Sequence, residues 1–248
     1  MGDLEYARAF AQGAGQRLLE LRVAAQARGV TGKELKDAGD SAAQKYLSEQ
    51  LRQHYPDDAV LSEESEDTKE RLHSSRVWII DPLDGTREYS EYRGDWAVHV
   101  ALWECGKLVT GAVALPGLGV VLGTDAVIER QPTAKGSPIR VAVSRSRPPA
   151  LIHELAQQLD LDLIPMGSAG YKVCAVVRGE VDAYIHAGGQ YEWDSAAPVA
   201  VAAGMGLHTS RIDGSVLRYN QENPYLPDLL VCRPELKDRL LEAIRFYN

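Results

Sequence analysis

Two carboxylates three positions apart, at the end of an apolar run, are the part of the sequence best suited to chemistry. Asp81 and Asp84 belong to the segment Asp-Pro-Leu-Asp-Gly-Thr at 81–86, which follows the apolar run 77–80. The β-branched and aromatic residues of this run predict an inner strand, and Pro82 is expected to end its ladder. The glycine and hydroxyl after Asp84 predict a turn into a helix, whose first N–H groups would bind phosphate.

The two carboxylates cannot bind phosphate directly, because both groups are negatively charged. A divalent cation between them removes this repulsion, so the segment predicts a metal-bridged phosphate site. A plain Asp-Gly turn at the end of a strand is the alternative. The complete string favours the metal site, since the strand, turn and helix that such a site needs are all predicted around it.

The segment 81–86 resembles a signature of the inositol monophosphatase superfamily, the Mg²⁺-dependent, lithium-sensitive phosphatases. Ser-Glu-Glu at 62–64 resembles that family's Gly-Glu-Glu element, in which the first glutamate binds metal. Glu-Trp-Asp-Ser-Ala-Ala-Pro at 192–198 resembles its second signature, whose aspartate binds metal from the opposite half of the fold. Mg²⁺ prefers carboxylate, carbonyl and water oxygens. The resemblance implies as metal ligands Glu63, Asp81, the carbonyl of Leu83, Asp84 and Asp194.

Asp40 lies 23 residues before Glu63, where the family has an aspartate that orients the attacking water together with a hydroxyl like that of Thr86. A threonine precedes this aspartate in the family, and Asp37 replaces it here. The alternative role for Asp40, and also for Asp194, is that of a helix N-cap. The resemblance implies catalytic roles for Asp40, Glu63 and Thr86. Water activated by two or three Mg²⁺ ions, with Mn²⁺ as an alternative, would attack a phosphomonoester directly.

Segments around this centre indicate the substrate. Arg-Glu-Tyr at 87–89 resembles the Lys-Glu-Phe of CysQ-like 3′(2′),5′-bisphosphate nucleotidases, which act on adenosine 3′,5′-bisphosphate (PAP), and often its sulfated form, in sulfur assimilation. Ser-Arg-Ser at 144–146 and Gly-Ser-Ala-Gly-Tyr-Lys at 167–172 resemble two of their substrate-binding elements. A second phosphate needs cations beyond the metals, which arginine and lysine would supply. The implied substrate-binding residues are Asp84, Gly85, Thr86, Arg87, Ser144, Arg145, Gly167, Ser168, Lys172 and Asp194.

Three alternatives stay open at this point. The first two are the same chemistry on inositol monophosphate or on fructose 1,6-bisphosphate, which the Arg-Glu-Tyr segment disfavours. The third is a non-catalytic binding protein on the same fold, which would have no need for four clustered carboxylates.

Composition excludes several classes of partner. The chain has 248 residues and a net charge of −8, which argues against nucleic-acid polymers and anionic membranes as partners. Neither a signal peptide nor an apolar run of spanning length is recognised, so a cytoplasmic protein acting on a small phosphorylated molecule is expected. Three widely spaced cysteines predict buried free thiols. The sequence leaves open whether the protein is a monomer or a homodimer.

Periodicity places these residues on a layered fold. Helices are predicted at 3–27 and 40–54, and an antiparallel meander at 96–124. The breaker-rich segment 131–138 predicts a boundary between halves 1–130 and 131–248, packed as one compact unit. Strands and helices alternate in the second half, which indicates an α/β protein. The family resemblance implies the αβαβα sandwich of inositol monophosphatase and fructose-bisphosphatase.

Overall fold

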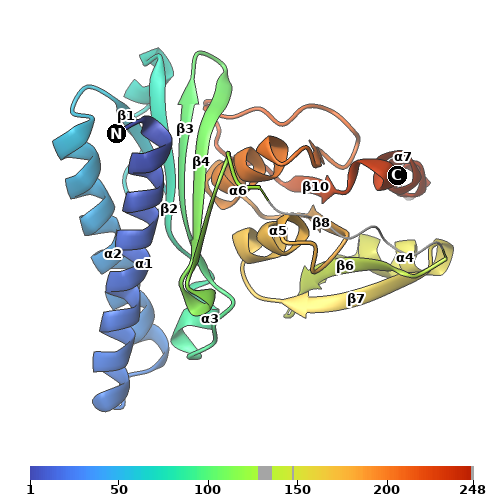
Figure 1. Cartoon of the computed structure of the whole chain (residues 1–248), viewed down its shortest axis with the longest axis horizontal. Helices are drawn as coiled ribbons and strands as arrows, with labels where there is room; N and C mark the ends of the chain where they lie inside the picture. Colours follow the sequence, from blue (N-terminus) through green and yellow to red (C-terminus); the bar gives the residue numbers. More distant parts are fainter. Residues whose placement is uncertain (128–135, 147, 247–248) are drawn as a thin grey trace.

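Two five-stranded sheets form the frame of the protein (Figure 1). The computed structural model describes residues 1–127, 136–146 and 148–246. In the first sheet, of order β1-β2-β3-β4-β5, only β1 and β2 are parallel neighbours. In the second sheet, of order β7-β6-β8-β10-β9, β6 is parallel to β7 and β8, and β10 is antiparallel to both neighbours. The strands are β1 (Ala59–Ser62), β2 (Arg76–Asp84), β3 (Ala97–Glu104), β4 (Lys107–Leu115), β5 (Val120–Gly123), β6 (Ile139–Ser144), β7 (Leu161–Met166), β8 (Ala183–Ala187), β9 (His208–Ser210) and β10 (Asp228–Cys232).

Helices cover both sheets in layers (Figure 1). One pair packs on the outer face of the first sheet, a second pair lies between the sheets, and a third covers the far face of the second sheet. These pairs are α1 (Asp3–Ala27) with α2 (Gly32–His54), α5 (Ala169–Val177) with α6 (Glu192–Gly204), and α4 (Ala150–Gln158) with α7 (Lys237–Arg245); α3 (Thr86–Ser90) follows β2. The layers confirm the predicted αβαβα sandwich.

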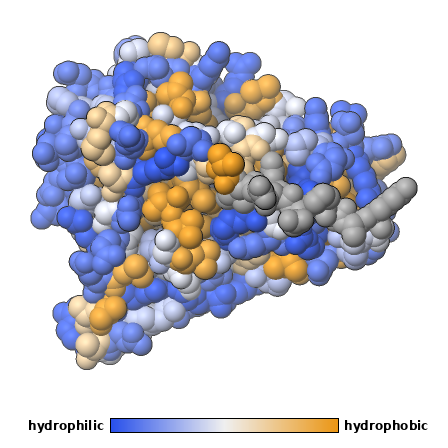
Figure 2. Space-filling view, viewed as in Figure 1, coloured by the Kyte–Doolittle hydropathy of each residue, from blue (hydrophilic) through white to orange (hydrophobic). Residues whose placement is uncertain are grey.

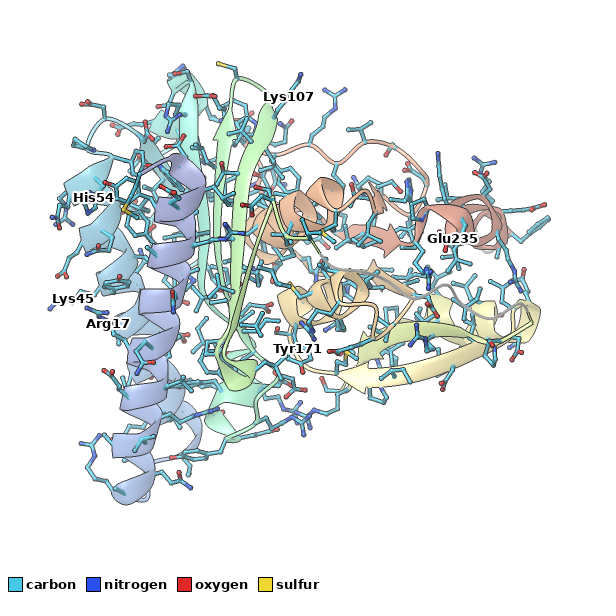
Figure 3. All side chains as sticks on the ribbon, viewed as in Figure 1. Arg17, Lys45, His54, Lys107, Tyr171 and Glu235 are labelled. Carbon is cyan, nitrogen blue, oxygen red and sulfur yellow. The ribbon has the colours of Figure 1, made fainter. Side chains whose placement is uncertain are left out.

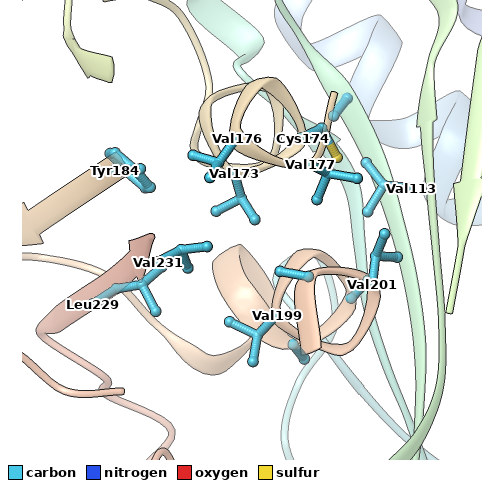
Figure 4. Packing of buried hydrophobic residues seen from close by; sticks show 14 of the residues in the cluster. Val113, Val173, Cys174, Val176, Val177, Tyr184, Val199, Val201, Leu229 and Val231 are labelled. Atoms are coloured by element: carbon cyan, nitrogen blue, oxygen red, sulfur yellow. The ribbon is translucent and has the colours of Figure 1, made fainter. Parts of the chain in front are cut away.

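The middle helix layer is apolar on every side because it is covered by a sheet on each face. Val173 of α5 and Val201 of α6 are both fully buried, as is Val113 of β4, against which this layer packs (Figure 4). A helix that is apolar all round has no polar face to mark its ends by periodicity. α6 begins at Glu192, so its first turn carries the polar residues Glu192 and Asp194 ahead of the apolar part of the helix.

The outer layer of α1 and α2 is amphipathic instead. Leu18 and Leu47 pack inward with Trp78 of β2, while Arg17 and Lys45 lie on the exposed side (Figure 3). In the view of Figure 2, hydrophilic residues surround apolar areas near the middle of the face. Within the described ranges, no helix has the length and apolar character needed to cross a membrane.

Two predicted element ends were wrong for physical reasons. α2 begins at Gly32, not at residue 40, because Leu35 and Gly39 are buried and extend the packed face of the helix towards its N-terminus. β2 continues through Pro82 to Asp84, where the register with β3 shifts. Proline is tolerated there because an irregular ladder does not need its missing N–H.

Two other expectations concern loops. Cys174 and Cys232 are buried as expected, but Cys105 is exposed because it lies in the turn between β3 and β4. Residues 131–135 of the predicted boundary lie outside the described residues. The division into halves 1–130 and 131–248 therefore stays a prediction.

An ion network around a buried carboxylate links the ends of three strands of the second sheet, since Arg140 lies in β6, Asp182 just before β8 and Arg233 just after β10. Asp182, which is fully buried, accepts hydrogen bonds from the Arg140 guanidinium at 2.8 and 3.0 Å and from Nη1 of Arg233 at 3.2 Å. Burial opposes ionisation of this carboxyl, but the hydrogen bonds of Arg140 and Arg233 outweigh it and lower the pKa of Asp182 to about 2. The network should therefore stabilise the fold whenever Asp182 is ionised.

We expect Asp182→Asn to lower the free energy of unfolding by about 1.5–3 kcal/mol at pH 7, the range for hydrogen bonds to a charged group. Because the folded pKa lies below the ordinary 3.8, the difference should persist above pH 4 and shrink as the pH falls towards 2. Urea unfolding at several pH values measures it. In the matched control Glu180→Gln, which removes an exposed partner of Arg178, the loss should stay below about 1 kcal/mol.

Candidate active site

The end of β2 holds two of the predicted metal ligands. Asp81 and Asp84 are 1% and 7% exposed, and Oδ1 of Asp81 accepts a hydrogen bond from the N–H of Leu83 at 3.0 Å. Side chains three positions apart on a regular strand point to opposite faces. The register shift between Asp81 and Asp84 removes this alternation, so both carboxylates reach one site. Gly85, with φ of 92°, then turns the chain into α3, a conformation that other residues rarely adopt.

Asp194 reaches the same site from the middle helix layer. One oxygen each of Asp81, Asp84 and Asp194 lie within 4.8 Å of one another. Asp194 is the third residue of α6, and its Oδ2 accepts a hydrogen bond from the N–H of Tyr191 at 2.7 Å. The predicted alternative role of Asp194 as the N-cap is therefore wrong, because the N-cap is Tyr191 and Asp194 accepts a hydrogen bond from it at the third helical position; Asp194 also faces the two carboxylates of β2. Three aspartates from two layers meet in one place.

The charges of this group suit a cation. Burial, followed by the negative charges of Glu63, Asp84 and Asp194, raises the pKa of Asp81 well above its usual range. Burial and the charge of Asp84 likewise raise the pKa of Asp194 to about 6. Oδ2 of Asp81 is buried and has no hydrogen-bond partner among the described residues. Buried carboxylates in such a group are stabilised by a metal ion, and an all-oxygen set fits a hard divalent cation.

Glu63 lies beside the three aspartates and extends the group. β1 runs parallel to β2 with Ser62 opposite Ile80, so the residues after both strands meet at one edge of the sheet. Burial, then the charges of Asp194, Glu64 and Asp84, raise the pKa of Glu63 to about 8. Its carboxylate oxygens are outside the 4.8 Å group of the three aspartates. Glu63 is therefore placed to complete a metal site rather than to form its centre.

Backbone N–H groups of α5 hold Asp84 from the other side. Gly170 N donates to Oδ2 of Asp84 at 2.6 Å, and Ala169 N donates to Oδ1 at 3.2 Å. The first turn of a helix has free N–H groups that stabilise an anion. Gly170 permits this approach, because a Cβ there would lie 1.9 Å from Nε2 of His99. The start of α5, expected to bind substrate, thus also fixes a metal ligand.

His99 is a site residue that the sequence analysis missed. It is fully buried in β3, with Nε2 3.2 Å from Oδ2 of Asp84 and Nδ1 3.1 Å from the carbonyl oxygen of Trp193. Burial disfavours the charged imidazole, but the facing carboxylate of Asp84 raises the pKa of His99 overall. The sequence signal that could have identified this residue is that it is the only histidine within the apolar run 96–103. A buried polar group needs a partner, so such a residue indicates a polar contact inside the protein.

Asp40 lies inside α2, so its predicted alternative role as an N-cap is wrong. The helix begins eight residues earlier, with Thr31 at its N-cap. Asp40 lines a cavity of about 450 Å³ together with Glu64 and Gln44, and Gln44 accepts a hydrogen bond from the Ser62 hydroxyl at 2.7 Å. Burial and the charges of Glu64 and Asp37 raise the pKa of Asp40 to about 7. Asp40 therefore faces the end of β1, next to Glu63.

A second cavity, of about 650 Å³, opens over the aspartates. Its walls bring together metal-site carboxylates, hydroxyls and cations from both halves of the chain. Of the predicted substrate-binding residues, it is lined by Asp84, Arg87, Ser144, Lys172 and Asp194; the sequence analysis missed Tyr184, His186 and Gln190, which also line it. Gly85 and Thr86 begin α3 beside Asp84, and both are partly exposed.

Lys172 lines the floor of this cavity, but its charged end is hydrogen-bonded to the protein backbone. It is 5% exposed, and its Nζ donates to the carbonyl oxygens of Gly167 and Ser168, which lie just before α5. Burial lowers the pKa of Lys172 to about 8. The Ser168 hydroxyl caps α5 by accepting a hydrogen bond from Tyr171 N at 3.1 Å. Gly167, Ser168 and Lys172 therefore shape the helix start that holds Asp84.

Comparison with known proteins places the chain in a family. A model described as the inositol monophosphatase family matches residues 3–248. A 3′-phosphoadenosine 5′-phosphate phosphatase of Mycobacterium bovis is 53% identical over 218 residues, which cover 85% of this chain and 82% of that protein. The 3′(2′),5′-bisphosphate nucleotidase CysQ of Escherichia coli K12 is 33% identical, over 76% of this chain and 81% of that protein.

Solved structures show the same fold. An inositol monophosphatase II from Staphylococcus aureus superposes with a TM-score of 0.80 at 19% identity, covering 96% of this chain and 91% of that one. The SuhB protein of Bartonella henselae gives 0.79 at 17% identity and covers 99% of both chains. Since the family model also matches nearly the whole sequence, the chain belongs to the inositol monophosphatase family.

Proposed function

We propose that the protein is a Mg²⁺-dependent phosphatase that removes the 3′-phosphate from adenosine 3′,5′-bisphosphate. The observation that carries the proposal is the meeting of three aspartates, two of them buried and Asp194 half-buried, beside a cavity lined by Asp84, Asp194, Arg87 and Lys172. Carboxylates suit the metal, while the cations suit a phosphate that is not cleaved. Relatives at 53% and 33% identity named for this class of substrate support the assignment.

Each site residue has a role in this proposal. The carboxylates of Asp81, Asp84, Asp194 and Glu63, with the Leu83 carbonyl, would hold two or three Mg²⁺ ions, for which Mn²⁺ could substitute. Bound Mg²⁺ would neutralise the charge of the phosphate oxygens and make water a stronger nucleophile. Asp40 and the Thr86 hydroxyl would orient that water by hydrogen bonding. The α5 N–H groups and His99 keep Asp84 in place, so the protein supplies positioning, which phosphoryl transfer chiefly requires.

Some of the predicted substrate-binding residues can contact the substrate directly, and others hold the neighbouring backbone in place. Arg87 is 53% exposed at its side chain and lines the cavity, so it can bind a phosphate directly. Ser144 lines the same cavity. Lys172 contributes positive charge at the floor of the cavity while holding the start of α5. Binding energy from a phosphate that does not react can align the one that does.

A substrate panel tests the proposed function. We expect phosphate release from adenosine 3′,5′-bisphosphate to exceed release from inositol 1-phosphate and fructose 1,6-bisphosphate by at least about tenfold in kcat/KM, and to vanish when EDTA removes the metal. Release restored by Mg²⁺ after EDTA checks that the protein remained folded. Preference for inositol 1-phosphate would contradict the nucleotide assignment, and metal-independent turnover would contradict the chemistry.

Removing one ligand charge should abolish turnover without unfolding the protein. We expect Asp84→Asn and Asp194→Asn each to lower kcat by at least about 100-fold at saturating Mg²⁺, because each weakens metal binding and charge neutralisation. Without metal, Asp194→Asn should not lower the thermal stability, since it relieves repulsion among the carboxylates, whereas Asp84→Asn should lower it modestly, because His99 and the α5 N–H groups favour the ionised Asp84. The exposed control Asp162→Asn should keep full activity. Wild-type kcat in either variant would rule out its metal-binding role.

Arg87→Ala separates recognition of the second phosphate from the common chemistry. We expect kcat/KM to fall about tenfold for adenosine 3′,5′-bisphosphate, because a charge-assisted hydrogen bond is lost. On inositol 1-phosphate, which has no second phosphate, the loss should be less than about twofold. Arg52→Ala, which changes an exposed arginine near the C-terminal end of α2, serves as the control. Equal losses on both substrates would place Arg87 at the metal centre instead.

A further inference from the structure

Two arginines share one glutamate at the rim of the cavity, where Arg87 lines the cavity and Arg145 lies between the lining residues Ser144 and Ser146. Nε of Arg87 lies 2.9 Å from Oε1 of Glu91, and Nη2 of Arg145 lies 2.7 Å from Oε2 of the same residue. Nη2 of Arg145 also donates to Oε1 of Glu88 at 3.0 Å. Each oxygen of Glu91 therefore has its own guanidinium. The two predicted phosphate-binding arginines are held together by an acidic residue of the protein.

The charges of this group cancel. Arg87 and Arg145 carry two positive charges, and Glu88 and Glu91 carry two negative ones. An anion entering the cavity thus meets no net positive charge at the rim unless a carboxylate leaves. The second phosphate of a substrate must compete with the glutamates for the same donors.

The two glutamates differ in how easily they can leave. The side chain of Glu88 is 9% exposed, whereas that of Glu91 is 39% exposed. Glu88 would lose its ion pair inside the protein, which is costly, while Glu91 can turn into water at little cost. Glu91 is therefore the carboxylate that a phosphate would displace, and Glu88 would keep Arg145 oriented.

We propose that Glu91 competes with the uncleaved phosphate of the substrate for Arg87 and Arg145, and thereby sets the affinity for bisphosphates. This inference rests on the proposed function, because it concerns the phosphate that is not hydrolysed. A phosphate carries up to two negative charges and three acceptor oxygens, so it can replace one carboxylate between two guanidinium groups. The competition weakens binding of the free substrate but leaves the metal centre untouched.

The variant Glu91→Gln tests this role, because it removes the charge and keeps the size. We expect its KM for adenosine 3′,5′-bisphosphate to fall about two- to fivefold, the range for an exposed ion pair, with kcat unchanged. The KM for adenosine 3′-phosphate, which lacks the second phosphate, should stay within about 1.5-fold of wild type. Glu180→Gln, which removes the exposed partner of Arg178 beyond the far end of α5, should leave both values unchanged.

An opposite result would assign Glu91 another role. If Glu91 instead positions the arginines for the substrate, Glu91→Gln will raise the KM for the bisphosphate, and the inference is overturned. An equal fall in KM for both substrates overturns it too, because it would reflect only the general loss of negative charge. Calorimetric binding of adenosine 3′,5′-bisphosphate without Mg²⁺ adds a readout independent of turnover. If the wild type does not hydrolyse this compound, the proposed function fails, and tighter or unchanged binding by the variant still decides the role of Glu91.

Discussion

Repulsion among buried carboxylates is the constraint on which the site depends. Oxygens of Asp81, Asp84 and Asp194 lie within 4.8 Å of one another, in surroundings that raise the pKa values of Asp81 and Asp194. A cluster of this kind lowers stability unless protons or cations neutralise it. The fold accepts this because the first sheet and the helix layer that carry the aspartates pack into one shared apolar core. The free-energy cost of this repulsion at a functional site must be offset by favourable packing elsewhere in the protein.

The arrangement couples the two layers through the candidate metal site. Asp81 and Asp84 belong to the first sheet, and Asp194 belongs to the helix layer behind it. His99 joins the same layers, because its two ring nitrogens face Asp84 and the Trp193 carbonyl. A cation bound by all three aspartates would bridge the same junction. Metal binding should therefore also stabilise the packing of α6 against the sheet, since a ligand that binds only the folded state stabilises it.

The sequence predicted the site residues that belong to short motifs. It did not predict residues whose roles depend on contacts between parts of the chain that are far apart. The segment 81–86 and Asp194 were recognised from short strings, and the structure brings them together. The role of His99 depends on a contact between β3 and residues of two other elements, which no local pattern encodes. The same holds for Glu91, whose pairing with Arg145 joins residues 54 positions apart. The start of α2 was missed for a related reason: the packing that stabilises its first turns involves residues distant in the sequence.

The overall charge explains why recognition should depend on short contacts. A protein with a net charge of −8 repels a bisphosphate at long range, so electrostatic steering would not bring the proposed substrate to the site. The carboxylates at the cavity floor add to the repulsion until cations occupy them. Attraction must then come from groups within hydrogen-bond distance, namely the metal-filled floor and the rim arginines.

Because Glu88 and Glu91 balance those arginines in the free protein, the rim offers little attraction to anions in general. A ligand with two phosphates could bind the metal ions at the floor with one phosphate and the rim arginines with the other. Inorganic phosphate or a monoester can bind at only one of these two places. Under the proposed function, selectivity for a bisphosphate would follow from the charge balance of the site, without requiring a tight pocket for the rest of the molecule.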